Sequence, residues 1–515
     1  MTETTQPAET RLRQTLETAL LNPIRAFRLR YLPLLMVYFA YGALGIITIA
    51  ETFWIKSALT MTPAELAALS VWLTLPWTIK MVFGELVDAV PIMGSQRKVY
   101  VLIGGTLVAA GLITLAGAAG GWLTFAEPQN LYRLGSFLSV VGVVLQDVAA
   151  DAMSTEVVDR EYPDGTPRDP KDVNRDLGMV QVLGRLALSF GMVAVAGIAG
   201  LLASTFSYET VFLLGLVIPL ISVSGALLID ITPTETRPVD WRILGGGIAF
   251  GAAVVAVATT GLPFGQEIVF VFSMAVVCAM LWRIVRDLDA RTQETILYAA
   301  IIIFIFRATP LVGQGYTWFT IDVLGFDEAF QGTLNQIGAV LALAGTWLFS
   351  DAITKRPVTV VLFWLTIVGT VLSLPSLALT LGISEWTQAT FGFGARTIAV
   401  IDTAASSPFM QLSMIPLLTL IAIYAPPTRR ATWFALMSSL MNLALVASAL
   451  QTKYVNTLLV VDRGAYENLP LLLGLVMTIG LVAPLAAILV FGRKLNAQQQ
   501  QTAAQVPHAQ TQKAS

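Results

Sequence analysis

Two carboxylates are spaced to share one face of a helix inside a strongly apolar segment. Asp147 and Asp151 occur in LQDVAADAMSTEVV, four residues apart, which is about one helical turn. Two neighbouring carboxylates cannot both stay ionised at low cost in a low-dielectric cavity. The pair could therefore take up and release a proton, anchor a solute that donates hydrogen bonds, or do both.

Four more ionisable residues lie within apolar segments, at Glu51, Lys80, Arg185 and Arg307. An ionised side chain near the centre of a bilayer costs about 2.5 to 3.5 kcal/mol on insertion scales, so each should face a partner or a water-filled cavity. Lys80 is too far from its helix end to reach the interface comfortably, and we expect it to pair with an acid. An ion pair of Lys80 with one aspartate that only sets helix packing is the alternative.

Arg307 precedes a segment that interrupts a helix, ATPLVGQGY. Pro and Gly free backbone groups there, which membranes tolerate where a helix lines a cavity. A guanidinium can bind a carboxylate through two parallel hydrogen bonds, so Arg307 suits an anionic solute. Pairing of Arg307 with a helix carbonyl is the structural alternative.

The whole chain has the composition of a membrane protein. Of 515 residues, 56% are hydrophobic and 12% are charged, about half the roughly 25% charge of a soluble protein. The net charge of −2 gives no indication of a nucleic-acid partner. One cysteine and one histidine, Cys278 and His508, cannot build a disulfide framework or a Cys/His metal site. We therefore expect no metal and no cofactor, and, without the Gly-x-Gly-Asp signature of an intramembrane aspartyl protease, no enzyme.

Apolar runs near 20 residues recur along the chain, each long enough to cross about 30 Å of hydrocarbon as a helix. Hydropathy and helix breakers together predict fourteen spans. Their approximate bounds are 32–55, 65–89, 98–120, 131–157, 176–202, 209–230, 242–260, 266–286, 294–323, 327–350, 357–381, 397–424, 431–456 and 469–492. An even number of spans places both chain ends on one side of the membrane.

Basic residues gather in alternate loops and predict the orientation. The richer set of loops and tails carries Arg97, Lys98, Arg160, Arg168, Lys171, Arg175, Arg237, Arg242, Arg283, Arg286, Arg291, Lys355, Arg356, Arg429, Arg430, Arg493 and Lys494. The opposite side has only Lys56, Arg396, Lys453 and Arg463. By the positive-inside rule both termini are cytoplasmic. The N-terminal segment lacks the pattern of a cleaved signal or a transit peptide, so we expect a bacterial cytoplasmic membrane.

Two similar loops predict two related halves. FGELVDAVPIMGSQRKVY and WLFSDAITKRPVT each place an acid at a helix end, then a tight turn and a basic pair. The acids are Asp88 and Asp351, and the pairs are Arg97 with Lys98 and Lys355 with Arg356. Such charges can lock neighbouring helix ends and release them during a rocking motion; ordinary stop-transfer charges are the alternative.

These loops lead us to predict six-helix bundles at 32–230 and 294–492, with the solute near the midplane between them. An inserted helix pair occupies 231–293. The N-terminal tail, 1–31, should contain a helix on the membrane surface, because leucines and arginines alternate there at helical spacing. The polar tail, 493–515, is expected to be disordered.

Four segments, in order along the chain, resemble signatures of the folate–biopterin transporter family, a branch of the major facilitator superfamily. They are KMVFGELVDAVPIMGSQRKVY, DVAADAMSTEVV, ATPLVGQGYTWFTIDVLGF and APPTRRATWFALMSSLMNL. Two places depart from the family pattern. Arg307 replaces a residue that is often neutral, and Arg429 and Arg430 stand where a glycine and an acid are commoner.

The resemblance implies proton-coupled transport of folates or pterins. With the spans predicted above, we expect an all-α integral membrane protein of about fourteen transmembrane helices that works by alternating access. The ionisable residues within its apolar segments are the candidate substrate-binding or proton-coupling residues: Glu51, Lys80, Asp147, Asp151, Arg185 and Arg307. Its partners would be the solute, protons and lipid, without nucleic acid, and we expect a monomer. A facilitator of another solute, such as a peptidoglycan fragment, a nucleotide or a drug, is the alternative.

The chemistry of a pterin matches these residues. A carboxylate can accept the two adjacent donors of its amino-pyrimidine edge, and Arg307, Arg185 or Lys80 would suit the anionic glutamyl tail of a folate. Aromatic side chains could hold the flat ring. The candidates are Tyr38, Tyr41, Phe53, Trp54, Tyr316 and Trp318, although packing is the more ordinary role for aromatics at such spacings.

Overall fold

The structure is a computed structural model in which the chain is built almost entirely of helices. It describes residues 25, 27–95, 97–162, 164–228, 238–260, 262–286, 288–354, 356–423 and 430–511, with only the backbone at 174, 350–352, 354, 423, 430–432 and 496–511. Within these ranges there are three isolated β-bridges and no β-strand. The predicted surface helix in 1–31 falls almost wholly outside the described residues.

The N-terminal half contains the first helices of the chain. They are α2 (Leu32–Ala43), α3 (Thr48–Ala58), α4 (Pro63–Thr78), α5 (Lys80–Ala89), α6 (Lys98–Gly120), α7 (Pro128–Glu156), α8 (Pro170–Thr205), α9 (Tyr208–Leu214) and α10 (Val217–Leu227). The 3-10 turn η2 (Leu44–Ile47) joins α2 to α3 within one span. Pro76 lies inside α4, and Ile79 leaves helical geometry, so the second span is divided into α4 and α5 directly before Lys80.

The C-terminal half follows an inserted pair, α11 (Trp241–Thr260) and α12 (Gly265–Val285). Its helices are α13 (Ala290–Arg307), α14 (Gln314–Asp322), α15 (Glu328–Thr354), α16 (Val358–Leu372), α17 (Leu374–Thr380), α18 (Ile383–Phe391), α19 (Ala395–Met410), α20 (Met414–Ile423), α21 (Arg430–Leu458) and α22 (Leu469–Thr511). The helix α22 continues well beyond residue 493, where we predict the ordered chain to end.

Thirteen helical segments of the described chain are long and apolar enough to cross a membrane. The predicted span that is not among them is 294–323, which the structure divides into α13 and α14. The chain leaves helical geometry over residues 308–313, where Pro310 has no N–H to donate and Gly313 adopts a positive φ of 81°. The predicted interruption after Arg307 is therefore confirmed.

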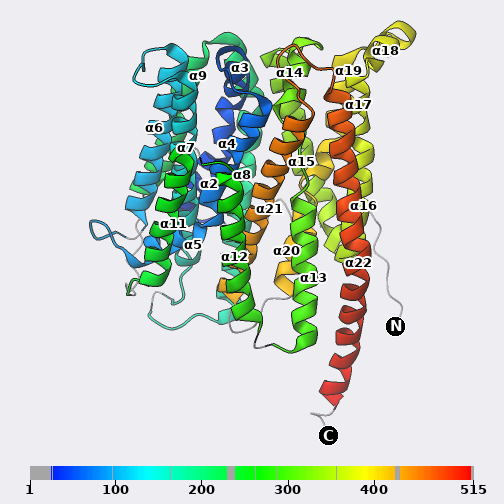
Figure 1. The fold of residues 1–515 in the computed structure, drawn as a ribbon. Helices are drawn as coiled ribbons and strands as arrows, with labels where there is room; N and C mark the ends of the chain where they lie inside the picture. Colours follow the sequence, from blue (N-terminus) through cyan, green and yellow to red (C-terminus); the bar gives the residue numbers. More distant parts are fainter. Residues whose placement is uncertain are drawn as a thin grey trace.

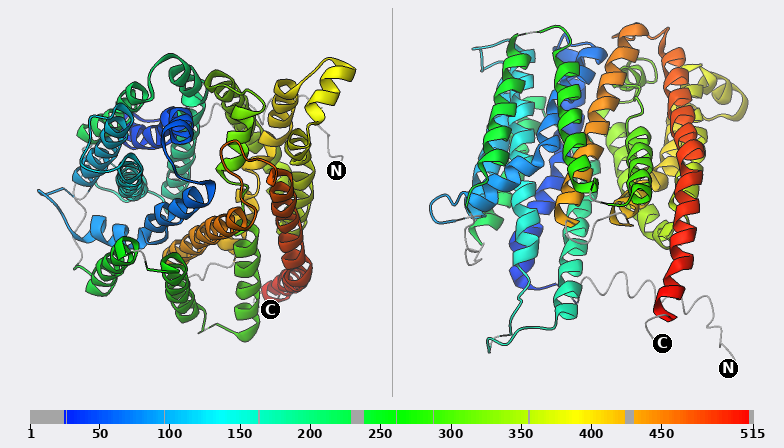
Figure 2. Two further views of the ribbon diagram at one scale, coloured as in Figure 1. Left: turned by 45° about the horizontal axis from the view of Figure 1, so that its top comes forward. Right: turned by 60° about the horizontal axis from the view of Figure 1, so that its bottom comes forward.

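The helices run side by side, with the N-terminal half on one side and the C-terminal half on the other (Figures 1 and 2). Two helix pairs, α8 with α15 and α4 with α21, pack along the seam between the halves. The inserted α12 covers part of this seam. Its Gln266 donates to the Ala68 carbonyl of α4 at 2.9 Å and accepts from Lys453 of α21 at 3.0 Å.

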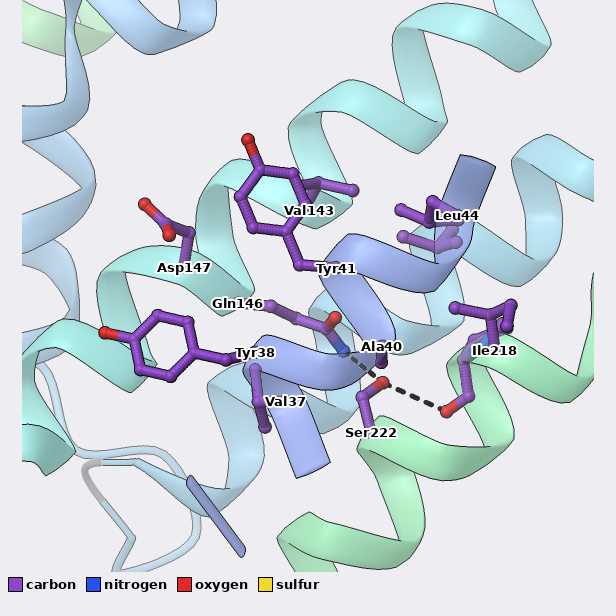
Figure 3. Close-up of a pocket in the computed structure, with 12 residues that line it drawn as sticks. Val37, Tyr38, Ala40, Tyr41, Leu44, Val143, Gln146, Asp147, Ile218 and Ser222 are labelled. Carbon is purple, nitrogen blue, oxygen red and sulfur yellow. Dashed lines mark hydrogen bonds between the residues drawn. The ribbon is translucent and has the colours of Figure 1, made fainter. Parts of the chain in front are cut away.

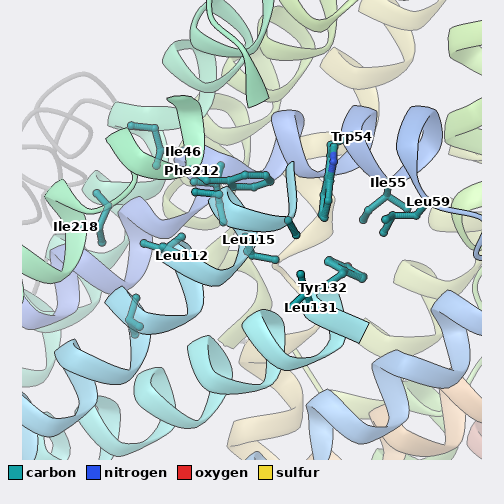
Figure 4. Packing of buried hydrophobic residues seen from close by; sticks show 14 of the residues in the cluster. Ile46, Trp54, Ile55, Leu59, Leu112, Leu115, Leu131, Tyr132, Phe212 and Ile218 are labelled. Carbon is teal, nitrogen blue, oxygen red and sulfur yellow. The ribbon is translucent and has the colours of Figure 1, made fainter. Parts of the chain in front are cut away.

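The two ends of the bundle are distinguished by their loops. We call the end where α2 begins and α22 finishes the terminal end, and the end formed by loops 59–62, 323–327 and 459–468 the distal end (Figure 1). An apolar core fills the distal part of the N-terminal half (Figure 4). Trp54, 3% exposed, packs edge-on against Tyr132 and Phe212 there.

This burial limits the aromatic residues that can reach a solute. Phe53, Trp54 and Trp318 are 8%, 3% and 0% exposed, respectively, and belong to apolar cores. Tyr38, which is also only 8% exposed, and the partly buried Tyr41 lie beside the charged residues described next.

Candidate functional site

Lys80, Asp147 and Asp151 form one charged cluster, which we call the triad. The Lys80 ammonium, at the start of α5, lies 2.6 Å from Asp151 Oδ2 and also forms an ion pair with Asp147. Both carboxylates project from one face of α7, as their spacing predicts. Their environments differ, because the side chain of Asp147 is 11% exposed and that of Asp151 is 51% exposed. Asp151 is thus the more accessible of the two acids.

Two tyrosines of α2 border the triad, and Figure 3 shows both on the side of α2 that faces Asp147. The Tyr38 hydroxyl donates to Asp151 Oδ1 at 2.8 Å, and Tyr41 lies beside Asp147 at a cavity of about 10 Å³. That volume holds roughly one water molecule. The cavity can supply water to Asp147 but cannot hold a ring-sized solute.

Arg185 of α8 adds a second cation close to the triad. It lies within electrostatic range of Asp147 and Tyr38, and it is exposed and forms no ion pair with a described residue. One turn earlier on α8, Gln181 donates to Ser154 of α7 at 2.7 Å, which holds the two helices together. Arg185 can therefore meet an anion without giving up a protein partner.

The structure does not bring Glu51 or Arg307 to the triad. Glu51 lies in α3 within the apolar distal part of the half, with the Tyr132 hydroxyl as its hydrogen-bond partner. Arg307 ends α13 in the other half, where one terminal nitrogen lies 2.8 Å from Met414 Sδ and Nε has no hydrogen-bond partner among the described residues. Four of the six predicted residues therefore converge, and Arg307 stands alone across the seam.

In the N-terminal half, the first of the two predicted loops contains an ion pair at the terminal end. Arg97, directly before α6, pairs with Asp88 of α5 at 2.9 Å and with Glu156 of α7 at 2.5 Å. It also donates to the Val87 carbonyl at 2.8 Å. Sequence spacing indicated Asp88 but not Glu156, which comes from a helix distant in sequence.

The other predicted loop residues contribute less. Lys98 is the first residue of α6. In the second loop, the side chain of Asp351 and all of Lys355 lie outside the described residues, and Arg356 is exposed.

The distal end carries contacts between the halves that sequence reasoning did not assign. Arg463, in the loop before α22, donates to the carbonyls of Ile55 at 3.0 Å, Lys56 at 2.7 Å, Leu59 at 2.7 Å and Met61 at 3.0 Å, all in the N-terminal half. Lys56 of α3 also forms an ion pair with Asp322 of α14. The one sequence feature that pointed to these contacts was the small number of cations in the loops on the side opposite the termini.

A close backbone contact supports the same closure. Gly200 of α8 meets Gly332 of α15 so tightly that a Cβ added at Gly332 would lie 2.7 Å from the Gly200 Cα. The Tyr208 hydroxyl donates to Glu328 at 2.8 Å just beside it. The two halves are thus held together at the distal end.

Comparison with known proteins decides the family. Residues 42–508 match the model of the BT1 family. The chain belongs to the BT1 family. A folate-biopterin transporter of Synechocystis sp. is 28% identical over 449 residues, covering 86% of this chain and 77% of the relative. Probable folate-biopterin transporter 4 of Arabidopsis thaliana is 23% identical and covers 84% and 89%. The resemblance stated from the sequence motifs is confirmed.

Solved structures agree with this fold for a BT1-family chain. A POT family transporter in complex with 5-aminolevulinic acid superposes with a TM-score of 0.65 at 15% identity, covering 90% of this chain and 96% of that one. A second POT family structure, with a thioalcohol-conjugated peptide, gives 0.63 at 16% identity and the same coverage. The predicted all-α, major-facilitator-type fold is confirmed. Family and fold together make the protein a membrane transporter and not an enzyme.

Proposed function

We propose that this BT1-family protein moves folate- or pterin-type solutes by alternating access and that proton binding at Asp147 or Asp151 is coupled to that movement. The names of its relatives support the solute class. The triad supports the coupling. We place the protein, as a monomer, in a bacterial cytoplasmic membrane with both termini in the cytoplasm, on the strength of its basic loops.

The observation that carries this proposal is that one ammonium serves two carboxylates. Lys80 contacts both Asp147 and Asp151, so the triad retains one negative charge when both acids are ionised. A proton or a hydrogen-bond-donating solute relieves this excess. Because the side chain of Asp151 is half-exposed and that of Asp147 is mostly buried, Asp151 is the acid that exchanges a proton with water. Lys80 remains paired with Asp147 when Asp151 is protonated.

The unpaired cations indicate where an anionic tail would bind. Lys80 is engaged by the two acids, but Arg185 and Arg307 have no carboxylate partner among the described residues. One belongs to each half of the protein. A solute with a polar ring near the triad and a carboxylate tail near one of these arginines would contact both halves, as a transported solute must if its binding is to bias their rocking.

The distal contacts support a closed outer side in this conformation. If the termini are cytoplasmic, Arg463, Lys56 and the Gly200–Gly332 contact close the protein towards the outside. The triad is then reached from the cytoplasmic side. Transport requires that these distal contacts open while contacts at the terminal end form.

A ligand panel tests the solute class. Purified protein in lipid nanodiscs would be melted with folate, a simple pterin, a nucleotide, a peptidoglycan fragment and a drug-like cation. Ligands that bind only the folded state raise the melting temperature in proportion to their affinity. Folate and the pterin are expected to raise it by several degrees. Stabilisation by one of the other compounds alone would overturn the solute class and leave the transporter fold untouched.

A further inference from the structure

A stacked aromatic pair lies directly beyond the triad. The rings of Tyr41 (α2) and Trp77 (α4) are 5.8 Å apart and inclined by 23°. Tyr41 follows Tyr38 by three residues on α2, so the two tyrosines lie near one face of that helix. Trp77 is in the last turn of α4, three residues before Lys80 begins α5. Both side chains are only partly buried. Part of each residue therefore remains exposed, although both pack against the apolar core of the N-terminal half.

The site has two levels along the membrane normal. Tyr38 and Asp151 form the level nearer the terminal end, with a hydrogen bond of 2.8 Å. Tyr41 and Asp147 lie about one turn further towards the distal end, because α2 and α7 run in opposite directions. Trp77 stands above Lys80 at this second level, so a solute that enters from the terminal end meets the aromatic pair after it passes Asp151.

The pair also lies where the two halves meet. The side chain of Asn442, on α21 of the C-terminal half, donates to the Trp77 carbonyl at 2.9 Å. This bond ties the Trp77 backbone to α21 at the α4–α21 seam. A solute ring stacked on the Trp77 side chain would therefore lie close to the contact between the halves.

We propose that the Tyr41–Trp77 pair is the surface against which the flat heteroaromatic ring of the solute stacks. This inference rests on the proposed function and names the residues that would recognise its ring. The tyrosine and tryptophan are too close together to admit a third ring between them, so the solute ring lies on the exposed side of the pair. Its amino-pyrimidine edge then points at Asp147 or Asp151, and its tail extends towards Arg185 or Arg307.

The aromatic pair and the carboxylates would recognise different features of the solute ring. An aromatic platform holds any flat ring by stacking and does not distinguish donors from acceptors. The carboxylates accept hydrogen bonds only, so they select rings with adjacent amino donors. Together they specify a planar, amino-bearing heterocycle.

Calorimetric binding of two ligands to the nanodisc protein tests the pair. The ligands are 6-hydroxymethylpterin, which is the ring alone, and folate. The variants are Trp77→Leu, which removes the platform, and Trp77→Phe, which restores an aromatic ring. Trp282→Leu is the matched control, because this tryptophan of α12 is 61% exposed on the inserted pair. We expect the pterin affinity to fall at least tenfold in Trp77→Leu, to stay within about threefold in Trp77→Phe, and to be unchanged in Trp282→Leu.

The outcomes separate this inference from the proposed function. Equal pterin affinities in Trp77→Leu and Trp77→Phe would overturn the stacking role while binding by the parent protein leaves the solute class in place. Absence of any folate or pterin binding to the parent protein would overturn both. If Trp77→Leu melts early, Tyr41→Leu makes the same comparison from the other ring, with Tyr41→Phe as its rescue.

Discussion

The guanidinium of Arg463 lies 4.0 Å from the centre of the Trp318 ring. The same guanidinium donates to four carbonyls around the C-terminal end of α3. One cation from the C-terminal half thus stacks on its own half while it caps a helix of the other, where the helix dipole favours positive charge. Arg463 therefore links the two halves at the distal end through several contacts at once.

Neighbouring residues reinforce this link. Lys56 pairs with Asp322, and the Tyr466 hydroxyl donates to the same carboxylate. Burial and the adjacent Asp322 carboxylate raise the pKa of the Tyr466 hydroxyl. A raised pKa keeps this hydroxyl protonated throughout the physiological range, so the hydrogen bond does not depend on pH there.

Replacement of Arg463 by Ala is expected to open the distal end more often. Met61 is 1% exposed beneath this link, so a Met61→Cys reporter in a Cys278→Ser background should react slowly with an impermeant maleimide. Loss of several hydrogen bonds of about 1 kcal/mol each should speed the reaction at least tenfold. Arg396→Ala is the matched control, because Arg396 pairs with Asp327 inside the C-terminal half. Equal labelling rates in both variants would contradict the role of Arg463.

Gly332→Val should open the same end for a steric reason. The new Cβ would meet the Gly200 backbone, which cannot move aside as a side chain can. We expect faster labelling of the Met61→Cys reporter and at least a tenfold loss of transport. Gly480→Val is the control, since no atom of the described part of the chain lies within 4 Å of a Cβ at Gly480. Normal transport by Gly332→Val would show that α8 and α15 need not approach each other so closely.

Arg185→Gln and Arg307→Gln should weaken folate binding more than pterin binding. Only folate carries the anionic tail, and a charge-assisted contact contributes about 1.5 to 3 kcal/mol, so we expect roughly a tenfold or larger loss for folate with little change for the pterin. Arg283→Gln, an exposed cation of the inserted pair, serves as the control. Equal losses of affinity for folate and for the pterin would mean that the arginines support the fold and do not contact the glutamyl tail.

Lys80→Met alone should destabilise the protein more than the double change Lys80→Met/Asp147→Asn. The single change leaves two carboxylates without their cation, and an unpaired buried charge is strongly destabilising. We expect a lower melting temperature and a loss of uptake in Lys80→Met, with the melting temperature partly restored in Lys80→Met/Asp147→Asn. Thermal melting of the purified variants checks this. No restoration in the double variant would mean that Lys80 does not neutralise Asp147.

Helix periodicity was enough to predict part of the site. Asp147 and Asp151 share a face because their spacing is a local property of α7. We expected Lys80 to pair with an acid because of its depth in the membrane. The interruption after Arg307 was predictable from Pro310 and the glycines. These features depend on short stretches of sequence or on the cost of charge in a membrane.

The remaining features depend on packing between helices distant in sequence. Glu51 has the same apparent depth as the triad residues, but η2 and α3 direct it to Tyr132. Arg307 contacts Met414, which no spacing indicates. The Tyr41–Trp77 stack and the Arg463 link also join residues that only the folded bundle brings together.

Uptake of labelled folate into proteoliposomes, with and without an imposed pH gradient, tests the central claim most directly. The parent protein should accumulate folate severalfold faster under the gradient. Asp151→Asn should lose that dependence, because an amide does not take up and release a proton as a carboxylate does. Asp164→Asn is the matched control. Hydrogen bonds from Thr166 lower the pKa of Asp164, so this loop acid stays ionised at neutral pH. A dependence on the gradient that persists in both Asp151→Asn and Asp147→Asn would contradict proton coupling at the triad.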